Sequence, residues 1–244
     1  MKDETPKRVS ALPIRKVALG VRYEPQYRIR DSIGALVDAI LRTAGTPFGP
    51  DVFPVSEAGA HTHRLVNPDN DNTLTITQSD AVLDFTVSTT DLDHVTELAA
   101  NYDRFVLQPL RKLCGVHRIC RFGLLMRFDE KGSHLLQPPI SRYSDQDLPT
   151  PRDLAIRFSY RLPTNEGYFR KHVNDFRNII YTLLQEDEGQ VSISLDCQEY
   201  FSPSLDVEDW EKRSFSVFAQ QAIFYHLGMF AGWVSKLAKI GRAA

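Results

Sequence analysis

The strongest constraint on the fold is an alternation of apolar side chains with small or polar ones at every second position. Near the start of the chain this alternation covers residues 17–23, with Val17, Leu19, Val21 and Tyr23 as the apolar members. A β-strand points successive side chains to opposite faces of its sheet, so the pattern predicts a strand with one buried face. Comparable segments occur at 61–66, 73–78, 81–88, 116–128, 154–162, 179–185 and 191–197. A chain of this kind is expected to fold around a β-sheet.

Other segments carry helical spacing. Apolar residues recur every three or four positions over 33–41, over 92–106 and over 214–235. Pro109 is expected to kink or break the second of these helices. A short further helix is suggested by the spacing of Phe169, Val173 and Phe176. Because turn signals join consecutive strands, the predicted fold class is α+β with a mainly antiparallel sheet.

The order of strand, helix, strands and helix occurs twice along the chain. The first half covers residues 1–128, and the second half, with the long C-terminal helix, covers 151–244. The proline-rich segment 129–150 lacks a sustained period and is predicted to be a linker or a long surface loop. Strand 154–162 resembles strand 17–23 in its alternation and its arginines. The two strands are therefore expected at equivalent places in two similar halves, an internal repeat.

Composition and charge exclude several classes of protein. The chain has 244 residues, 29 basic and 31 acidic side chains and a formal charge of −2, so bulk electrostatics give no reason to expect a nucleic-acid or membrane partner. Three cysteines without a C-x-x-C spacing indicate reduced thiols, and a cytoplasmic location is expected. Residues 214–235 are uncharged but include Gln220, Gln221 and His226, which favours a buried helix over a membrane span.

Familiar catalytic and nucleotide-binding motifs are absent from the sequence. It contains no G-x-x-x-x-G-K-[ST], no G-x-G-x-x-G, no G-x-S-x-G and no H-E-x-x-H. His61 and His63 would share one face of a strand, but no third metal ligand can be placed beside them. We therefore expect no cofactor and no metal. A non-enzymatic function is favoured, and an enzyme of unrecognised type stays open as an alternative.

Arginines recur on the less apolar face of three predicted strands. The candidate ligand-binding residues are Arg22, Arg121, Arg157 and Arg161. Guanidinium groups bind phosphate or carboxylate through two hydrogen bonds, so this face is a candidate site for an anionic ligand or nucleic acid. The alternative is that these arginines pair with Asp84, Asp196 or Glu24 and only solvate the sheet. The predicted aromatic positions do not alternate with the arginines, which argues against a platform for single-stranded nucleic acid.

The segments VALGVRYEP at 17–25 and FYHLGMF at 224–230 resemble a sporadically distributed, uncharacterised bacterial protein family of roughly this length. The similarity extends over most of the chain in pattern and includes no catalytic signature. It implies an uncharacterised α+β protein that is an accessory component of a bacterial defence or mobile-element locus. It supplies no functional residue.

Aromatic residues are concentrated in the C-terminal region beyond what one helix stripe can bury. The candidate interface residues are Trp210, Phe215, Phe224, Phe230 and Trp233. This excess indicates a surface for a protein partner or for self-association into an oligomer. The sequence therefore favours a non-enzymatic binding or assembly protein, with the arginine-rich face as the alternative site.

Overall fold

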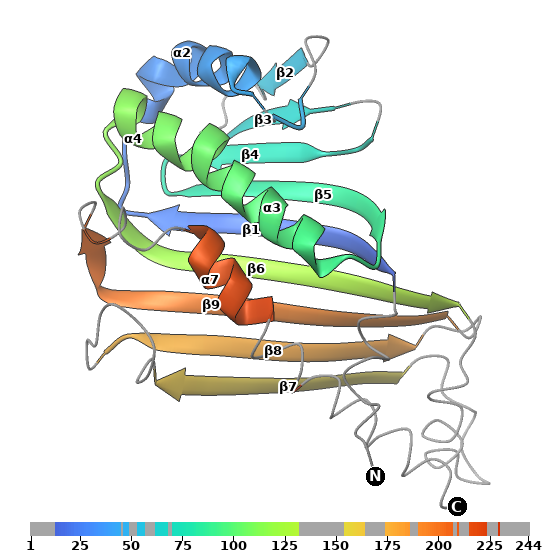
Figure 1. Ribbon diagram of the computed structural model, residues 1–244. Coiled ribbons are helices and arrows are strands. Elements are labelled where there is room, and N and C mark those ends of the chain that lie inside the picture. Colours follow the sequence, from blue (N-terminus) through green and yellow to red (C-terminus); the bar gives the residue numbers. More distant parts are fainter. Residues whose placement is uncertain are drawn as a thin grey trace, which may run out of the picture.

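The structure is a computed structural model. It describes residues 13–44, 46–48, 53–56, 62–67, 70–131, 154–163, 174–185, 190–206, 209, 215–223 and 229. An α+β architecture, as the sequence predicts, results from one antiparallel sheet with helices packed against it (Figure 1).

The sheet has nine strands in the order β2-β3-β4-β5-β1-β6-β9-β8-β7, and every neighbouring pair is antiparallel. The strands are β1 (Ile14–Tyr23), β2 (Phe53–Ser56), β3 (Thr62–Val66), β4 (Thr73–Thr77), β5 (Asp80–Thr89), β6 (Arg118–Lys131), β7 (Leu154–Pro163), β8 (Phe176–Gln185) and β9 (Gln190–Asp206). Pairing of β6 with β9 joins the two predicted halves into one continuous sheet.

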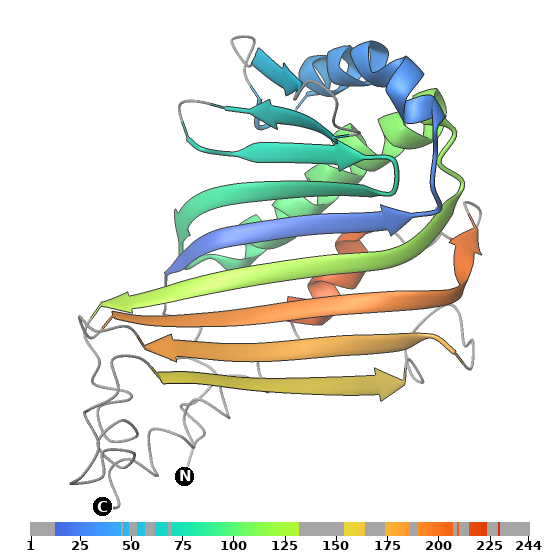
Figure 2. The same ribbon diagram turned by 180° about the vertical axis from the view of Figure 1, so that it is seen from behind.

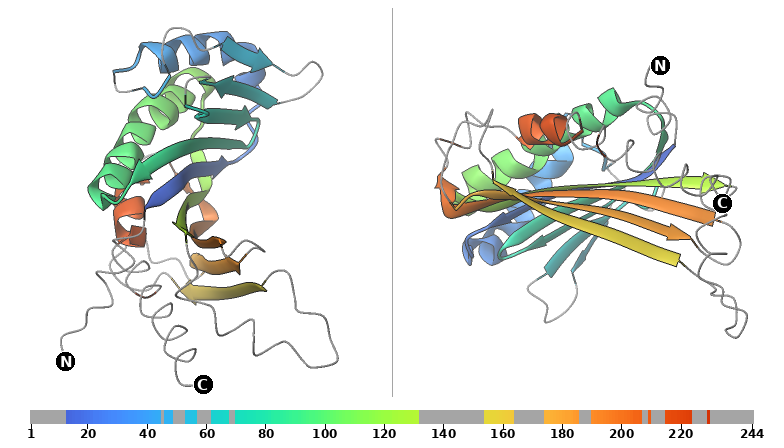
Figure 3. Two further views of the ribbon diagram at one scale, coloured as in Figure 1. Left: turned by 90° about the vertical axis from the view of Figure 1, so that its right-hand side faces the viewer. Right: turned by 90° about the horizontal axis from the view of Figure 1, so that it is seen from below.

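All described helices cover one face of this sheet. They are α2 (Arg28–Arg42), α3 (Leu92–Tyr102), the π-helical turn η1 (Asp103–Leu107), α4 (Gln108–Cys114) and α7 (Phe215–Gln221). Figure 1 shows them in front of the strands, Figure 2 shows the opposite face, and Figure 3 shows the two layers and the twist of the sheet. Pro109 lies in the first turn of α4, where its missing N–H costs least, so the break that it was predicted to cause is a π-helical turn between two helices.

The period-two alternation of the strands sorts side chains between the two faces. On β1, Val17, Leu19 and Val21 are at most 2% exposed and face the helices. We call this helix-packed side the covered face. The intervening positions, with their register partners on the other strands, form what we call the open face, on the side that carries no helix among the described residues.

An aromatic cluster fills the core under α7. Phe122 of β6 contacts Phe201 of β9 edge to face at 5.3 Å between ring centroids, and Phe215 at 5.2 Å. Phe215 and Phe218 also contact each other at 5.5 Å. Edge-to-face pairs at these distances stabilise a core beyond the apolar area that they bury. The cluster fixes α7 against the middle of the sheet.

The predicted equivalence of strands 17–23 and 154–162 is not confirmed. β1 lies between β5 and β6 in the interior of the sheet, whereas β7 is the last strand of the order. The two strands share a local alternation pattern, but the pairing partners of a strand are set by long-range contacts that local pattern does not encode.

Of the predicted linker or long surface loop at 129–150, the structure describes only the first residues. Strand β6 continues to Lys131, so residues 129–131 belong to the sheet, and 132–153 lie outside the described residues. Among the residues that are described, no helix is long and apolar enough to span a bilayer.

Candidate functional site

The open face carries more cations than carboxylates among the side chains that the structure describes in regular strand register. Its cations are Lys16, Arg22, Arg64, Arg121, Arg127, Arg157 and Arg161, and its carboxylates are Asp80, Asp84 and Asp196. The whole chain has a formal charge of −2, so this face is locally positive on a net acidic protein. All four arginines that the sequence predicts as ligand-binding residues lie on this one face.

Arg22 has an acidic partner, although not one that the sequence indicates. Its Nε donates to Asp80 Oδ1 at 2.8 Å, and Asp80 is its register partner on β5. Asp84, a predicted partner of the arginines, instead pairs with Lys16 at 3.1 Å. The expected pairing of the arginines with Asp84 is therefore not what the structure shows.

Arg157 is exposed, and among the described residues it makes no hydrogen bond and no ion pair. The carboxylate that it influences is Asp196. Burial raises the pKa of Asp196, while a hydrogen bond from Gln198 and the charges of Arg121 and Arg157 lower it. Asp196 already accepts from Gln198 Nε2 at 2.8 Å. Within the described ranges, the interaction of Arg157 with Asp196 is therefore one of charge without a hydrogen bond.

Arg161 and Arg121 lie at the two ends of a stack of planar groups that crosses β7, β8, β9 and β6. The guanidinium carbon of Arg161 is 3.7 Å from the centroid of the Phe176 ring. Phe176 stacks on Tyr200 at 4.6 Å with an interplanar angle of 11°. Arg121 lies 5.6 Å from the Tyr200 centroid and donates to its hydroxyl at 3.4 Å. We call this set the stacked row.

Stacking fixes a guanidinium while leaving its in-plane donors accessible. A cation over an aromatic ring is held by the ring quadrupole, and its N–H groups point outward in the guanidinium plane. Such donors are the groups that bind phosphate or carboxylate in two-point geometry. Arg121 already donates through Nη1 to Gln198 and to the Tyr200 hydroxyl, so within the stacked row the two arginines differ in their hydrogen bonds.

The aromatic members of the stacked row are functional candidates that the sequence analysis missed. Phe176 was assigned to a short helix, but it begins β8, and β9 extends past Cys197 to Asp206, which places Tyr200 on the open face. The expectation that no aromatic side chain lies among the arginines is therefore wrong. Extending the alternation of Ser192, Ser194 and Asp196 by two further steps would have reached Tyr200.

At the end of the sheet a separate polar cluster is internally compensated. Arg118 pairs with Asp206 at 3.1 Å and approaches Glu24 at 3.7 Å. Ser204 donates to Glu24 at 2.8 Å. Exposed pairs of this kind contribute little to stability, and this cluster of one arginine and two carboxylates adds no positive charge to the face.

On the covered face, Arg177 is buried and ion-paired, in contrast to the exposed Arg157 of the open face. Arg177 of β8 is 4% exposed and Glu199 of β9 is 1% exposed, and Arg177 Nη2 donates to Glu199 Oε2 at 2.6 Å. The guanidinium of Arg177 also lies 5.8 Å from the Phe218 ring of α7. This pair is enclosed between the sheet and α7, so it belongs to the fold and not to the candidate site.

A second buried carboxylate holds the start of α7. Asp103, in the π-helical turn, accepts from the backbone N–H of Phe215 at 3.0 Å and of Ser216 at 3.1 Å. Burial raises the pKa of Asp103 to about 6, and these two hydrogen bonds act in the opposite direction. Asp103 therefore caps α7 from a remote element.

The candidate interface residues are placed only in part. Phe215 is fully buried in the aromatic cluster and is a core residue, so it does not form a surface in this structure. The other four residues, Trp210, Phe224, Phe230 and Trp233, lie outside the described residues. Within the described ranges, no three His, Cys, Asp or Glu side chains gather closely enough to hold a metal ion.

Comparison with known proteins does not assign this chain to a family. No family model and no curated protein matches the chain. Among solved structures, the chain has a likeness to Methanococcus jannaschii TBP with a TM-score of 0.33 and 11% identity, covering 86% of this chain and 97% of the other. A TM-score this low establishes neither a shared fold nor a shared function.

Proposed function

We propose that this protein is a non-enzymatic binding protein whose open face binds an anionic ligand that bears phosphate or carboxylate groups. The observation that carries the proposal is the concentration of arginines on one face of a protein whose net charge is negative. Local positive potential of this kind attracts anions although the molecule as a whole repels them.

The environment of the arginines supports binding over simple solvation of the sheet. Arg157 makes no ion pair among the described residues, and Arg161 is held against a ring. Arg121 donates to neutral acceptors, Gln198 at 3.5 Å and the Tyr200 hydroxyl at 3.4 Å. A carboxylate or phosphate would be a stronger acceptor than either.

Titration of the protein with tripolyphosphate by calorimetry tests this proposal. The variant Arg157→Gln/Arg161→Gln removes two cations from β7 and keeps polar side chains of similar length. Because hydrogen bonds to charged groups contribute about 1.5–3 kcal/mol each, we expect an affinity loss of about tenfold or more. Retention on immobilised heparin should fall in parallel.

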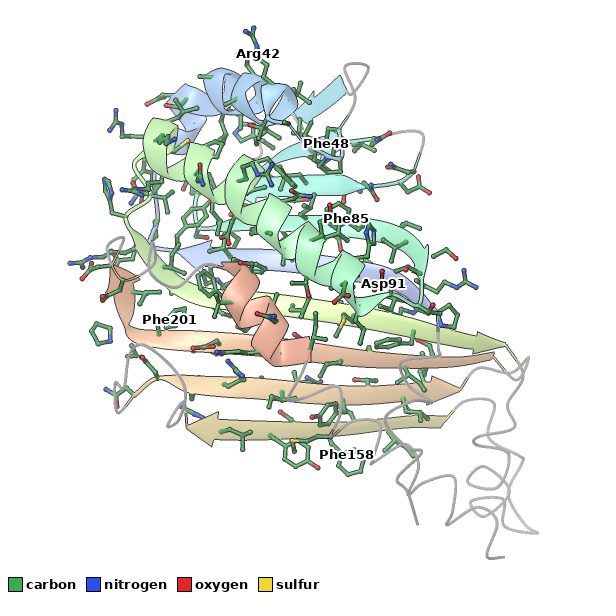
Figure 4. All side chains as sticks on the ribbon, in the orientation of Figure 1. Arg42, Phe48, Phe85, Asp91, Phe158 and Phe201 are labelled. Atoms are coloured by element: carbon green, nitrogen blue, oxygen red, sulfur yellow. The ribbon has the colours of Figure 1, made fainter. Side chains whose placement is uncertain are left out.

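Arg42→Gln provides the matched control. Arg42 lies on α2, at the end of the molecule remote from β7, and is paired with Asp38 at 2.7 Å (Figure 4). The Arg42→Gln variant lowers the net charge by one, whereas the double variant lowers it by two, and Arg42→Gln leaves the open face intact. The proposal fails if the Arg157→Gln/Arg161→Gln variant binds tripolyphosphate and heparin as tightly as Arg42→Gln does.

A protein partner or a second copy of the chain is the second candidate, favoured by β7. Within the described part of the chain β7 pairs with β8 alone, and Tyr160 and Leu162 on its covered-face side are 42% and 37% exposed. An edge strand beside exposed apolar side chains favours strand addition by a partner. Sedimentation of Tyr160→Lys against the unaltered chain tests it, and an unchanged monomeric mass in both would remove self-association.

A further inference from the structure

We infer that the ligand of the open face is an extended acidic segment of a partner protein, which adds to the sheet as a further strand beside β7 and places carboxylates opposite Arg157 and Arg161. This inference rests on the proposed function and names the class of ligand. It follows from three features of β7: its place in the sheet, the alternation of its side chains and the spacing of its two arginines.

Strand β7 has the form of a template for another strand. It is the last of the described strands in the sheet order and is ten residues long. It pairs with β8 at ten successive positions, from Leu154 opposite Gln185 to Pro163 opposite Phe176. The N–H and C=O groups of an edge strand that point away from its neighbour can pair with an extended peptide.

The strand at the other end of the sheet order, β2, differs in length and in composition. It has four residues, and Pro54 lacks the N–H that a ladder hydrogen bond needs. Short length and proline are ways in which a protein protects a sheet edge from pairing. Of the two ends of the described sheet, β7 is therefore the one built as a long and regular strand.

The side chains of β7 alternate between two chemistries. Arg157, Ser159 and Arg161 are exposed on the open face, whereas Tyr160 and Leu162 point to the other side and are 42% and 37% exposed. A strand laid beside β7 has the same period of two, so it would meet cations on one side and apolar groups on the other. Cross-strand pairs of opposite charge, like apolar pairs, stabilise a sheet. The complementary segment therefore alternates acidic with apolar residues.

A neighbouring strand would bring a carboxylate closer to Arg157 than Asp196 is. The charge of Asp196 acts on Arg157 from β9, two strands away from β7, and its carboxylate accepts from Gln198 at 2.8 Å. A carboxylate directly opposite Arg157 on an added strand would be one strand spacing away, about 4.8 Å. Such a carboxylate would be the nearer acidic partner.

The spacing of the two arginines favours a strand over a small anion. Arg157 and Arg161 are four residues apart on β7, about 13 Å at about 3.3 Å per residue. Arg161 is stacked on Phe176, the register partner of Pro163, so its guanidinium leans away from Arg157. A neighbouring strand has the same rise per residue, so acidic residues four positions apart in it would meet both arginines.

The same arginines disfavour a second copy of the chain as the occupant. If two β7 strands paired antiparallel with Ser159 opposite its own copy, each Arg157 would lie opposite an Arg161. Like charges in such positions destabilise a sheet, and opposite charges stabilise it. Charge complementarity therefore selects an acidic segment of another protein.

Two peptides of identical composition and charge, each as long as β7, test the pattern of the segment. In one peptide glutamate and valine alternate, and in the other all glutamates precede all valines. Only the alternating peptide can present carboxylates to one side of β7 and apolar groups to the other. Fluorescence anisotropy of the labelled peptides should show that the alternating peptide binds about tenfold more tightly or better. Equal affinity for the two peptides would overturn the inference.

Arginine variants test where the alternating peptide binds. Arg157→Gln/Arg161→Gln should weaken its binding about tenfold or more. Arg30→Gln/Arg42→Gln on α2 is the matched control, because it lowers the net charge by the same amount, and it should bind as the unaltered chain does. An equal loss in the two variants would mean that net charge alone attracts the peptide, and the inference would be wrong.

Hydrogen exchange, read residue by residue, separates strand addition from simple attraction of charge. In an antiparallel edge strand, alternate N–H groups bond to the neighbouring strand and the others point outward. Binding of the alternating peptide should slow exchange at the outward N–H groups of β7 and leave β2 unchanged. Unchanged exchange in β7 while the peptide is bound, as would follow if another segment already holds this edge, would contradict the inference.

Tripolyphosphate keeps this inference separable from the proposed function. If the peptide tests fail while tripolyphosphate still distinguishes Arg157→Gln/Arg161→Gln from Arg42→Gln, the inference is wrong and the proposed function stands. If neither the alternating peptide nor tripolyphosphate distinguishes these variants, the proposed function is wrong as well.

Discussion

The two faces of the sheet use arginine in opposite ways. On the covered face, Arg177 is enclosed beneath α7 and bonded to Glu199 at 2.6 Å. On the open face, Arg157 is exposed without an ion pair among the described residues, and Arg161 rests on an aromatic ring. A buried cation needs a carboxylate to be tolerated, whereas an exposed cation needs none. The fold therefore fixes the partner of Arg177 but not those of the open-face arginines, and this difference is why we propose the open face as the binding surface.

The contrast between the two faces predicts that stability and ligand affinity respond to different substitutions. Substitutions of buried polar groups on the covered face should lower stability and leave ligand affinity unchanged in the folded protein. Substitutions of open-face arginines should do the reverse.

Glu199→Ala should have the largest effect on stability. It leaves the Arg177 guanidinium buried without this carboxylate, and removal of one partner of a buried ion pair costs about 3–5 kcal/mol. Urea denaturation measures the loss. The double variant Arg177→Met/Glu199→Leu replaces both charges by apolar groups and should be markedly more stable than Glu199→Ala. A double variant that is no better would show that the cost is not due to an uncompensated charge.

The second-largest effect on stability should come from titration of Asp103 and should appear as a dependence of stability on pH. Its pKa is raised in the folded state from 3.8 to about 6, so the folded protein binds this proton more tightly than the unfolded chain does. The resulting stabilisation is complete below about pH 4 and is lost as the pH rises through about 6, an effect on the order of 2–3 kcal/mol.

Asp103→Asn is the reference for this measurement because its side chain is uncharged at every pH and keeps one oxygen acceptor. The stability of the unaltered chain relative to Asp103→Asn should therefore decrease between about pH 4 and about pH 7. A difference that stays constant, or that increases with pH, would contradict the assignment.

Asp103→Ala should have a smaller effect, by releasing the start of α7. The backbone N–H groups of Phe215 and Ser216 lose their acceptor, and loss of a helix cap costs about 0.5–2 kcal/mol. Hydrogen exchange should quicken in α7 while β1 and β6 stay protected. Equal acceleration across the sheet would mean that Asp103 supports the whole core and not this one helix.

Arg157→Gln and Arg161→Gln should have the smallest effect on stability. Substitutions of exposed residues away from special features change stability by about 0.5 kcal/mol or less. The same variants are those in which ligand affinity should fall most. If either costs as much stability as Asp103→Ala, the arginines of β7 have a structural role and the contrast between the two faces disappears.

Local pattern in the sequence predicts the strands and the face to which the arginines belong. The alternation around Arg22, Arg121 and Arg157 places all three on the less apolar face, and the register of the sheet brings them to the same side. This works because side-chain direction in a strand follows directly from a period of two.

Strand ends and strand neighbours are not predicted in the same way. Phe176 fits a helical spacing with Phe169 and Val173, and tertiary pairing with Tyr200 places it in β8 instead. The opposition of Gly20 to Gly123 depends on pairing between residues 103 positions apart, which single-sequence periodicity does not contain. The acidic partner of Arg22 was missed for the same reason.

Footprinting of arginines by a dicarbonyl reagent, with and without tripolyphosphate, tests the central claim most directly. Modification at each arginine is read by mass spectrometry on the unaltered protein. The open face predicts protection of Arg121, Arg157 and Arg161 by the ligand, with no change at Arg30 and Arg42 on α2. Equal protection of the α2 arginines, or unchanged modification of all five under conditions where the ligand is bound, would contradict the assignment of the open face as the binding surface.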